Sequence, residues 1–515
     1  MNRRELLQCG FALAGSGFAA GEAMPISSEA DQPCEPCVPA DLPAAPSPHA
    51  RLRVKPVMTN MIHSGVWEGP CRFNVVSVAR EAEAVRRAFD GWAGEIQSGK
   101  FAFGSQTEVL KPHLIAFAED FTLPAAQLLP LDEEAGNTDV YFVAPYGSSI
   151  ATFDIASRFH KPVILYGLNC RTVDIAAYAR TKGEEVFVVQ DNSELSALVS
   201  LLRARKVFRE TRILFPTNRG FPAVASLTGI TDLQDLENRL GVTVKMIPYK
   251  ALSDEMERTL ANPGAQRKAE ETAGELIRNA RETYLDPKYV ASSLMFYETV
   301  QSLMNTHACN AFTIECFEFC SSRLPEKWKI TPCLIHTLLK DQGHASSCEG
   351  DLGALLAMRL LMSVSGKSSH LGNMFFEEGK VVVINHSAPG IRMNGFDKAG
   401  LPYKLGRFTK AGWGAKAVVD FMQNDVREAT VARVHPNARQ VLVMKGRLVG
   451  SEGWDKDELG CSVVARIVPA ATGEGEKFVR KQTEYGNHLI WVYGDYAQEV
   501  TRLGELLDLE VEVVS

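Results

Sequence analysis

The chain has 515 residues, 45% of them hydrophobic and 23% charged, which is typical of a globular protein of two to four domains. Its formal net charge is −7, and aromatic residues are not interleaved with Lys/Arg runs, so we expect no nucleic-acid partner. Eleven cysteines, an odd number scattered through a long chain, do not form a disulfide framework.

The N-terminus differs from the rest of the chain. Residues 1–23 contain the pair Arg3 and Arg4, a mild apolar run rich in Gly and Ala, and small residues near Ala23. This pattern predicts a twin-arginine signal and export to the periplasm. A frayed N-terminus of a cytoplasmic protein is the alternative. No stretch reaches the ~20 apolar residues of a permanent membrane span.

Residues 24–56 are rich in Pro, Ala and Ser and are predicted to form a disordered linker. Cys34 and Cys37 form a CEPC pair within it, which by itself is weak evidence for a metal. Folded sequence is expected to begin near Val57.

From there to about residue 300, short apolar runs alternate with helical patterns. Strands are predicted at 138–146, 161–167, 184–191 and 211–217, and helices at 79–97, 150–159, 172–181 and 269–285. This alternation indicates βαβ units with mainly parallel sheets. We find no Walker loop and no G-x-G-x-x-G, so a nucleotide-binding role gets no support.

After about residue 370 the pattern changes to short β-rich runs. They lie at 381–385, 429–435, 440–450, 461–468 and 489–495, and a final helix is predicted at 496–510. A largely antiparallel sheet or barrel fits these runs. The predicted fold class is therefore α/β, with two Rossmann-like βαβ domains (57–170 and 171–345) followed by a β-rich, barrel-like C-terminal domain (346–515).

Two acids stand at the start of a strongly apolar helix in CEGDLGALLAMRLLMSVSG. Asp351 is well placed to cap this helix at its N-terminus, where the helix dipole favours an anion. Capping does not explain Glu349, because an uncompensated buried carboxylate is costly. Glu349 therefore either reaches solvent or has a cation.

Two histidines stand at the ends of apolar strands, where active-site groups often lie. His386 ends the strand in VVVINH and His488 opens the strand in HLIWVYGD. The alternative for each is a satisfied histidine at a packing interface. Oxygen ligands with one or two imidazoles would suit Mn²⁺.

The segments CEGDLGALLAMRLLMSVSG, SSHLGNMFF, VINHSAPG and GNHLIWVYGDYAQEVTRLGELLDLE follow in this order. They resemble the C-terminal half of the L-fucose and L-arabinose isomerases and their uncharacterised relatives. The resemblance runs from about residue 55 to 515, and IHSGVWEGPCR resembles an early segment of those relatives.

The resemblance implies a metal site and a base. Glu349 corresponds to a metal ligand that is also a candidate proton-transfer base, His488 to a ligand, and His386 to a further ligand in the arabinose-type enzymes. The second acidic ligand of the family corresponds to Asn373, a departure, since an amide oxygen can bind a metal but cannot accept a proton. Candidates to replace that acid are Asp351, Glu377 and Glu378.

The implied function is a metal-dependent aldose–ketose isomerase that works through an ene-diolate, on a free aldose or deoxy-aldose, with Mn²⁺ (or Mg²⁺ or Co²⁺). Glu349 and Asp351 are the candidate catalytic residues. One alternative is a protein of the same fold that binds sugar and metal with lost or altered isomerase chemistry, because of Asn373. Another is a scaffold in which CEGD is only a helix cap.

The resemblance also implies a homo-oligomer, a trimer or hexamer, in which a neighbour helps to close the sugar site. Candidate sugar contacts are Trp67, Arg72 and Trp413, since ring stacking and hydroxyl pairing suit these side chains. Ordinary core or rim aromatics are the alternative for the two tryptophans. The sequence does not identify the sugar.

Overall fold

The structure is a computed structural model that describes residues 49–69, 72–377 and 380–514. The predicted signal, most of the predicted linker, the CEPC pair and Glu378 lie outside the described residues.

The first strand, β1 (Leu52–Met61), begins inside the predicted linker, so the expectation that the linker reaches residue 56 was wrong. Charged Arg53 and Lys55 and the neighbouring Pro56 concealed the strand. Lys55 is nonetheless buried, and its ammonium is paired with Glu134.

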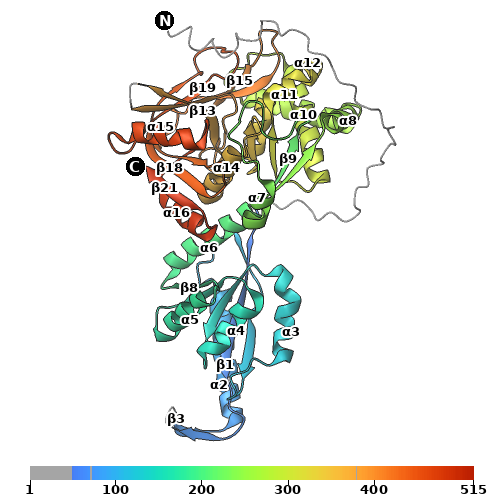
Figure 1. Cartoon of the computed structure of the whole chain (residues 1–515). Helices are drawn as coiled ribbons and strands as arrows, with labels where there is room; N and C mark the ends of the chain where they lie inside the picture. The colour runs from blue at the N-terminus through green and yellow to red at the C-terminus, as the bar shows by residue number, and fades with distance from the viewer. Residues whose placement is uncertain (1–48, 70–71, 378–379, 515) are drawn as a thin grey trace, which may run out of the picture. The chain divides into compact units, whose positions relative to one another are not determined.

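The first sheet is parallel and has the strand order β4-β1-β6-β7-β8, with β5 also pairing with β1. Its other strands are β4 (Thr107–Val109), β5 (His113–Phe117), β6 (Val140–Pro145), β7 (Val163–Tyr166) and β8 (Val186–Val189). The helices of this half are α2 (Val78–Gln97), α3 (Ala125–Glu134), α4 (Ser149–Phe159), α5 (Cys170–Thr181) and α6 (Asn192–Arg209). Apolar side chains fill two hydrophobic clusters that include strands of this sheet, as parallel βαβ units require. Figure 1 shows the helices α3, α4 and α5 beside the strands of this sheet.

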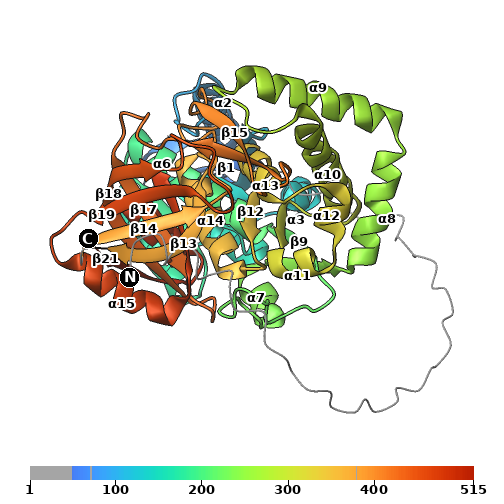
Figure 2. The same ribbon diagram turned by 90° about the horizontal axis from the view of Figure 1, so that it is seen from above.

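A second parallel sheet has the order β10-β9-β11-β12. Its strands are β9 (Arg212–Pro216), β10 (Thr243–Ile247), β11 (Ala311–Ile314) and β12 (Ala345–Cys348). Its helices are α7 (Leu233–Leu240), α8 (Tyr249–Leu260), α9 (Pro263–Asn279), α10 (Pro287–Thr306), α11 (Cys316–Ser321), α12 (Leu324–Trp328) and α13 (Cys333–Asp341). Figure 2 shows α8 and α9 along the outer edge of this part of the chain, with α10 inside them.

The C-terminal part contains a closed antiparallel barrel of six strands. The order β17-β20-β13-β14-β19-β18 is closed by pairing of β18 with β17, and β21 (Glu510–Val514) adds to β18 in parallel. The barrel strands are β13 (His370–Glu377), β14 (Val381–His386), β17 (Glu428–Val434), β18 (Gln440–Glu452), β19 (Val463–Pro469) and β20 (His488–Tyr493). The predicted fold class, βαβ units followed by a barrel-like part, is confirmed.

The remaining elements are small hairpins and helices. They are β2 (Trp67–Gly69) with β3 (Arg72–Val76), β15 (Tyr403–Arg407) with β16 (Ala415–Val419), the short helix η1 (Ala135–Asn137), α14 (Leu352–Ser365), α15 (Glu474–Tyr485) and α16 (Ala497–Leu506). Among the described residues, no helix combines the length and the apolar character needed to cross a membrane.

The helix α14 links the second sheet to the barrel. It follows β12, is buried continuously from Leu352 to Met362, and packs against β12, β17 and β20. The β12 strand pairs with β11, so the predicted domain boundary at 345/346 cuts through a strand of the second sheet. The other domain bounds stay predictions.

Candidate metal centre

Three buried side chains that are far apart in the sequence meet at one point. Glu349 directly follows β12, His386 is the last residue of β14, and His488 is the first residue of β20. One ligand atom of each lies within 4.8 Å of the others. The Glu349 carboxylate approaches His488 Nε2 at 3.3 Å and His386 Nε2 at 3.5 Å.

A strained turn places Glu349 at this point. Glu349 has a φ of +63° and Gly350 one of +64°, so both lie in the left-handed region. A side chain in that region costs about 1–2 kcal/mol, which the surrounding contacts must offset. The backbone N–H of Glu349 donates to Ile314 at the end of the adjacent strand β11 (2.8 Å). The second sheet therefore fixes the carboxylate at its edge.

Asp351 holds His488 in one orientation. The imidazole Nδ1 of His488 lies 2.9 Å from an Asp351 oxygen, so this nitrogen donates and Nε2 is directed at Glu349. The same carboxylate caps α14 by accepting from Ala354 N–H (2.9 Å), which confirms the predicted cap. A carboxylate behind a histidine in this way fixes the tautomer of a metal-binding imidazole.

The other contacts of Asp351 occupy both of its oxygens. Arg433 Nη1 lies 2.7 Å from each oxygen, and the Ser226 hydroxyl donates to one of them at 2.8 Å. Both Asp351 and Arg433 are fully buried. These contacts favour a positioning role for Asp351 over the predicted catalytic one.

The charges around the group set the protonation of its acids. Burial alone would raise the pKa of Glu349, but the hydrogen bonds and charges of His386 and His488 lower it well below its usual range. Burial likewise opposes ionisation of Asp351, yet the Arg433 charge and the bond from His488 hold its pKa well below its usual range. Both acids are therefore carboxylates at neutral pH.

Two thiols contact the other ring nitrogen of His386, Nδ1. This Nδ1 atom lies 3.8 Å from the Cys461 thiol and 3.9 Å from the Cys348 thiol. Among the described residues, the polar contact of each buried Nε2 atom, in His386 and in His488, is the long one to the Glu349 carboxylate.

These atoms fit the donor set of a divalent cation. Ligands about 2.1 Å from a tetrahedral ion lie about 3.4 Å apart, close to the two separations between Glu349 and the imidazoles. Without an ion, two buried imidazole nitrogens would have only these long contacts to a carboxylate, and buried polar groups are normally better satisfied. The buried Glu349–His386–His488 group can thus bind a metal ion. Ligand roles for the individual residues stay predictions.

The other predicted site residues lie elsewhere or have other contacts. Asn373 is the cross-strand partner of His488, but its side-chain oxygen accepts a hydrogen bond from Asn487. The Glu377 carboxylate is paired with Arg466. A metal role for Asn373 stays a prediction.

The predicted sugar contacts stay predictions as well. The ring of Trp67 stacks on His63 with 4.6 Å between centroids, and Trp413 lies beneath the Lys329 ammonium. Arg72 belongs to β3, and its side chain lies outside what the structure describes.

The residues that sequence reasoning missed are Arg433, Ser226 and the two thiols. Arg433 carried a signal, because it stands in the middle of the predicted strand ATVARVH. Cys461 also opens a predicted strand. Ser226 lies between β9 and α7 and carried no signal.

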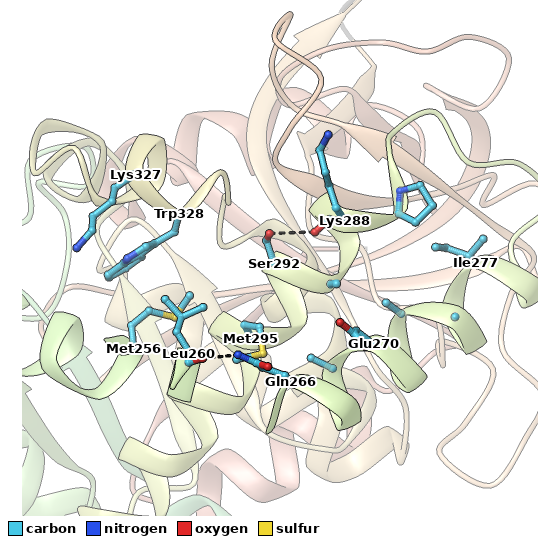
Figure 3. A pocket seen from close by; sticks show the side chains of 15 residues that line it. Met256, Leu260, Gln266, Glu270, Ile277, Lys288, Ser292, Met295, Lys327 and Trp328 are labelled. Atoms are coloured by element: carbon cyan, nitrogen blue, oxygen red, sulfur yellow. Dashed lines mark hydrogen bonds between the residues drawn. The ribbon is translucent and has the colours of Figure 1, made fainter. Parts of the chain in front are cut away.

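A separate cavity of about 620 Å³ opens between α8, α9, α10 and α12 (Figure 3). Apolar side chains such as Met256, Ile277 and Trp328 line it, with Lys288 and Glu270 among its polar groups. None of its lining residues belongs to the Glu349–His386–His488 group, so it is not the proposed chemical site.

Comparison with known proteins points to sugar chemistry. Two curated proteins named sulfoquinovose isomerase, from Priestia aryabhattai and Priestia megaterium (strain ATCC 12872 / QMB1551), are each 27% identical to this chain over 187 residues. The match covers 35% of this chain and 40% of each relative, so it spans less than half of either protein. No family model matches the chain. The match supports a relationship to sugar isomerases, without singling out the L-fucose and L-arabinose enzymes.

Proposed function

We propose that this chain is a metal-dependent sugar isomerase that interconverts an aldose or deoxy-aldose with its ketose. The observation that carries the proposal is the buried carboxylate that faces two buried imidazole nitrogens, with one ligand atom of each residue within 4.8 Å of the others. The partial similarity to proteins named sulfoquinovose isomerase supports a sugar as the substrate.

Glu349, His386 and His488 would hold the cation. When bound, a divalent ion supplies positive charge that stabilises an ene-diolate of the substrate. Two imidazoles with one carboxylate favour Mn²⁺ or Co²⁺ over Mg²⁺, which prefers oxygen ligands. Asp351 keeps the His488 lone pair directed inward. Glu349 is our candidate for the group that carries the proton between C1 and C2.

A second candidate function is sugar and metal binding with altered or absent isomerisation. Asn373 favours it, because an amide at the position of the family's second acid cannot accept a proton. A scaffold explains Asp351 as a helix cap but does not explain why two buried imidazoles converge on Glu349.

Metal analysis tests the site itself. Purified wild-type protein is expected to bind Mn²⁺, and Glu349→Ala, His386→Ala and His488→Ala are each expected to lose it, as measured by elemental analysis after dialysis. His435→Ala is the matched control, since its ring contacts Tyr485 and the Asn437 backbone outside the group. Full metal stoichiometry in all three variants would show that the site is assigned wrongly.

Substrate exchange distinguishes the two functions. Aldoses and ketoses, with sulfoquinovose included, are incubated with the Mn²⁺-loaded protein in D₂O and followed by NMR for deuterium at C1 or C2. An isomerase incorporates deuterium, and a binding protein shifts sugar resonances without exchange. Asn373→Asp is expected to raise the exchange rate if this position is the missing base.

We also propose twin-arginine export and a homo-oligomeric assembly, a trimer or hexamer. Arg3→Lys combined with Arg4→Lys is expected to leave the protein in the cytoplasm, measured by cell fractionation. Sedimentation of the mature chain gives the oligomeric state, and a strictly monomeric protein would contradict that proposal.

A further inference from the structure

Four thiols gather around the proposed metal site from different parts of the fold. Cys348 ends β12, Cys316 begins α11, Cys333 begins α13, and Cys461 precedes β19. The Cys316 and Cys348 side chains are hydrogen-bonded to each other, and Cys348 and Cys461 both contact His386 Nδ1. These are four of the seven cysteines within the described part of the chain.

Cys461 differs from the other three because it combines exposure with a fixed position. It is an exposed residue, whereas Cys333 and Cys348 are buried. The buried Lys416 ammonium donates to the carbonyls of Glu458 and Gly460 and to the Ser462 hydroxyl, at 2.7 Å each. These hydrogen bonds from Lys416 fix the segment that carries Cys461, and the Cys461 sulfur contacts His386.

The Ser387 hydroxyl contacts both the Cys461 thiol and a second thiol, that of Cys333. The Ser387 hydroxyl donates to Cys333 Sγ at 3.0 Å and lies 3.5 Å from Cys461 Sγ. Ser387 directly follows His386, so the two thiols flank the residue next to a proposed ligand. Rotation of the Ser387 side chain would remove the atom between them.

A soft-metal site does not explain this arrangement. Cys348 and Cys461 each contact His386, yet among the described residues the three do not form a group with mutual separations within 4.8 Å, as Glu349, His386 and His488 do. A thiol on an exposed residue, an imidazole and a buried second thiol are the components of a peroxide-reactive cysteine with a resolving partner.

We propose that Cys461 is an oxidative modification site, that a hydroperoxide is the oxidant, and that Cys333 is the resolving thiol. The Cys461 sulfur attacks the O–O bond of the peroxide. An S–O bond forms, the O–O bond breaks, and an alcohol or water leaves with the thiol proton, so sulfur is oxidised and the peroxide oxygen reduced. Cys333 sulfur then displaces the sulfenic oxygen, an S–S bond forms, and water leaves with the second proton.

The modification would act on the metal site through His386. A Cys333–Cys461 disulfide draws the sulfur away from His386 Nδ1, and loss of such an outer contact typically lowers metal affinity 10–100-fold. This second part rests on the proposed function, because it requires His386 to bind a cation. The oxidation of Cys461 itself does not depend on the proposed function.

The first experiment follows the thiols of the wild-type protein directly. The protein is treated with one to a few equivalents of hydrogen peroxide in the presence of a sulfenic-acid-trapping diketone and then digested for mass spectrometry. Cys461 is expected to be trapped first and a Cys333–Cys461 peptide pair, lighter by two hydrogens, to follow. Cys170, exposed at the start of α5, is the internal control. Cys170 reacting as fast as Cys461 would overturn the proposal.

Two variants complete the test. Cys333→Ser is expected to increase the trapped sulfenic acid at Cys461 and to abolish the disulfide. Cys461→Ser is expected to keep Mn²⁺ after peroxide, under conditions in which the wild type loses it. Equal metal loss in Cys461→Ser and in the wild type would show that oxidation of Cys461 does not act on the metal site through His386. It would not contradict the oxidation of Cys461 itself. Absence of metal before peroxide would count against the proposed function alone.

Discussion

Asp351→Asn separates a positioning role from a catalytic one. The amide still caps α14, because Asn is as good an N-cap as Asp. It removes the charge that pairs with the fully buried Arg433. Stranding a buried charge costs about 3–5 kcal/mol of unfolding free energy. Losing the carboxylate behind His488 also lowers Mn²⁺ affinity by about 10–100-fold, or about 1.4–2.7 kcal/mol.

Urea unfolding of the metal-free protein measures the first effect, and titration calorimetry with Mn²⁺ measures the second. The double variant Asp351→Asn with Arg433→Met is expected to recover part of the stability, because no charge is then stranded, while the metal affinity stays low. A stability loss below about 1 kcal/mol together with unchanged Mn²⁺ affinity would refute the assignment of Asp351 as the residue that orients His488.

The turn and the buried lysine give further tests. Gly350→Ala is expected to destabilise the protein by more than about 1 kcal/mol in urea unfolding, because its φ is +64° and a Cβ would lie 3.0 Å from Ala223 and Phe215; an unchanged midpoint would contradict this. Burial lowers the pKa of Lys340 from 10.5 to about 8. The unfolded chain therefore binds more protons between these values, and stability relative to Lys340→Met is expected to rise by about 3 kcal/mol from pH 8 to 10.5. A flat difference between the two unfolding curves would show that Lys340 is not desolvated.

The fold was predictable in outline because its signals are local. Parallel strands buried on both faces appear as short apolar runs between helices, and both sheets arose where such runs occur. The closure of the barrel was not predictable from periodicity, because pairing of β17 with β18 depends on register between strands. The start of β1 was missed because Lys55 is buried only through its ion pair with Glu134.

The site was predictable only in its most polar parts. Glu349, His386 and His488 were visible as chemical residues at the ends of apolar segments, and the resemblance to known isomerases grouped them. The residues that surround them could not be predicted. Arg433 and Ser226 both contact Asp351, but each lies more than eighty positions away from it in the sequence. Such contacts are set by packing, which no local pattern records.

The three proposed donors come from two kinds of sheet, and this has a mechanical consequence. Glu349 directly follows β12 of the second parallel sheet, and the two imidazoles belong to β14 and β20 of the barrel. A cation held between them would cross-link strands that share no backbone hydrogen bond, so its binding free energy would add to the stability of both sheets at once. Chelation should then accelerate amide exchange in β12 and β20 together, although neither strand pairs with the other.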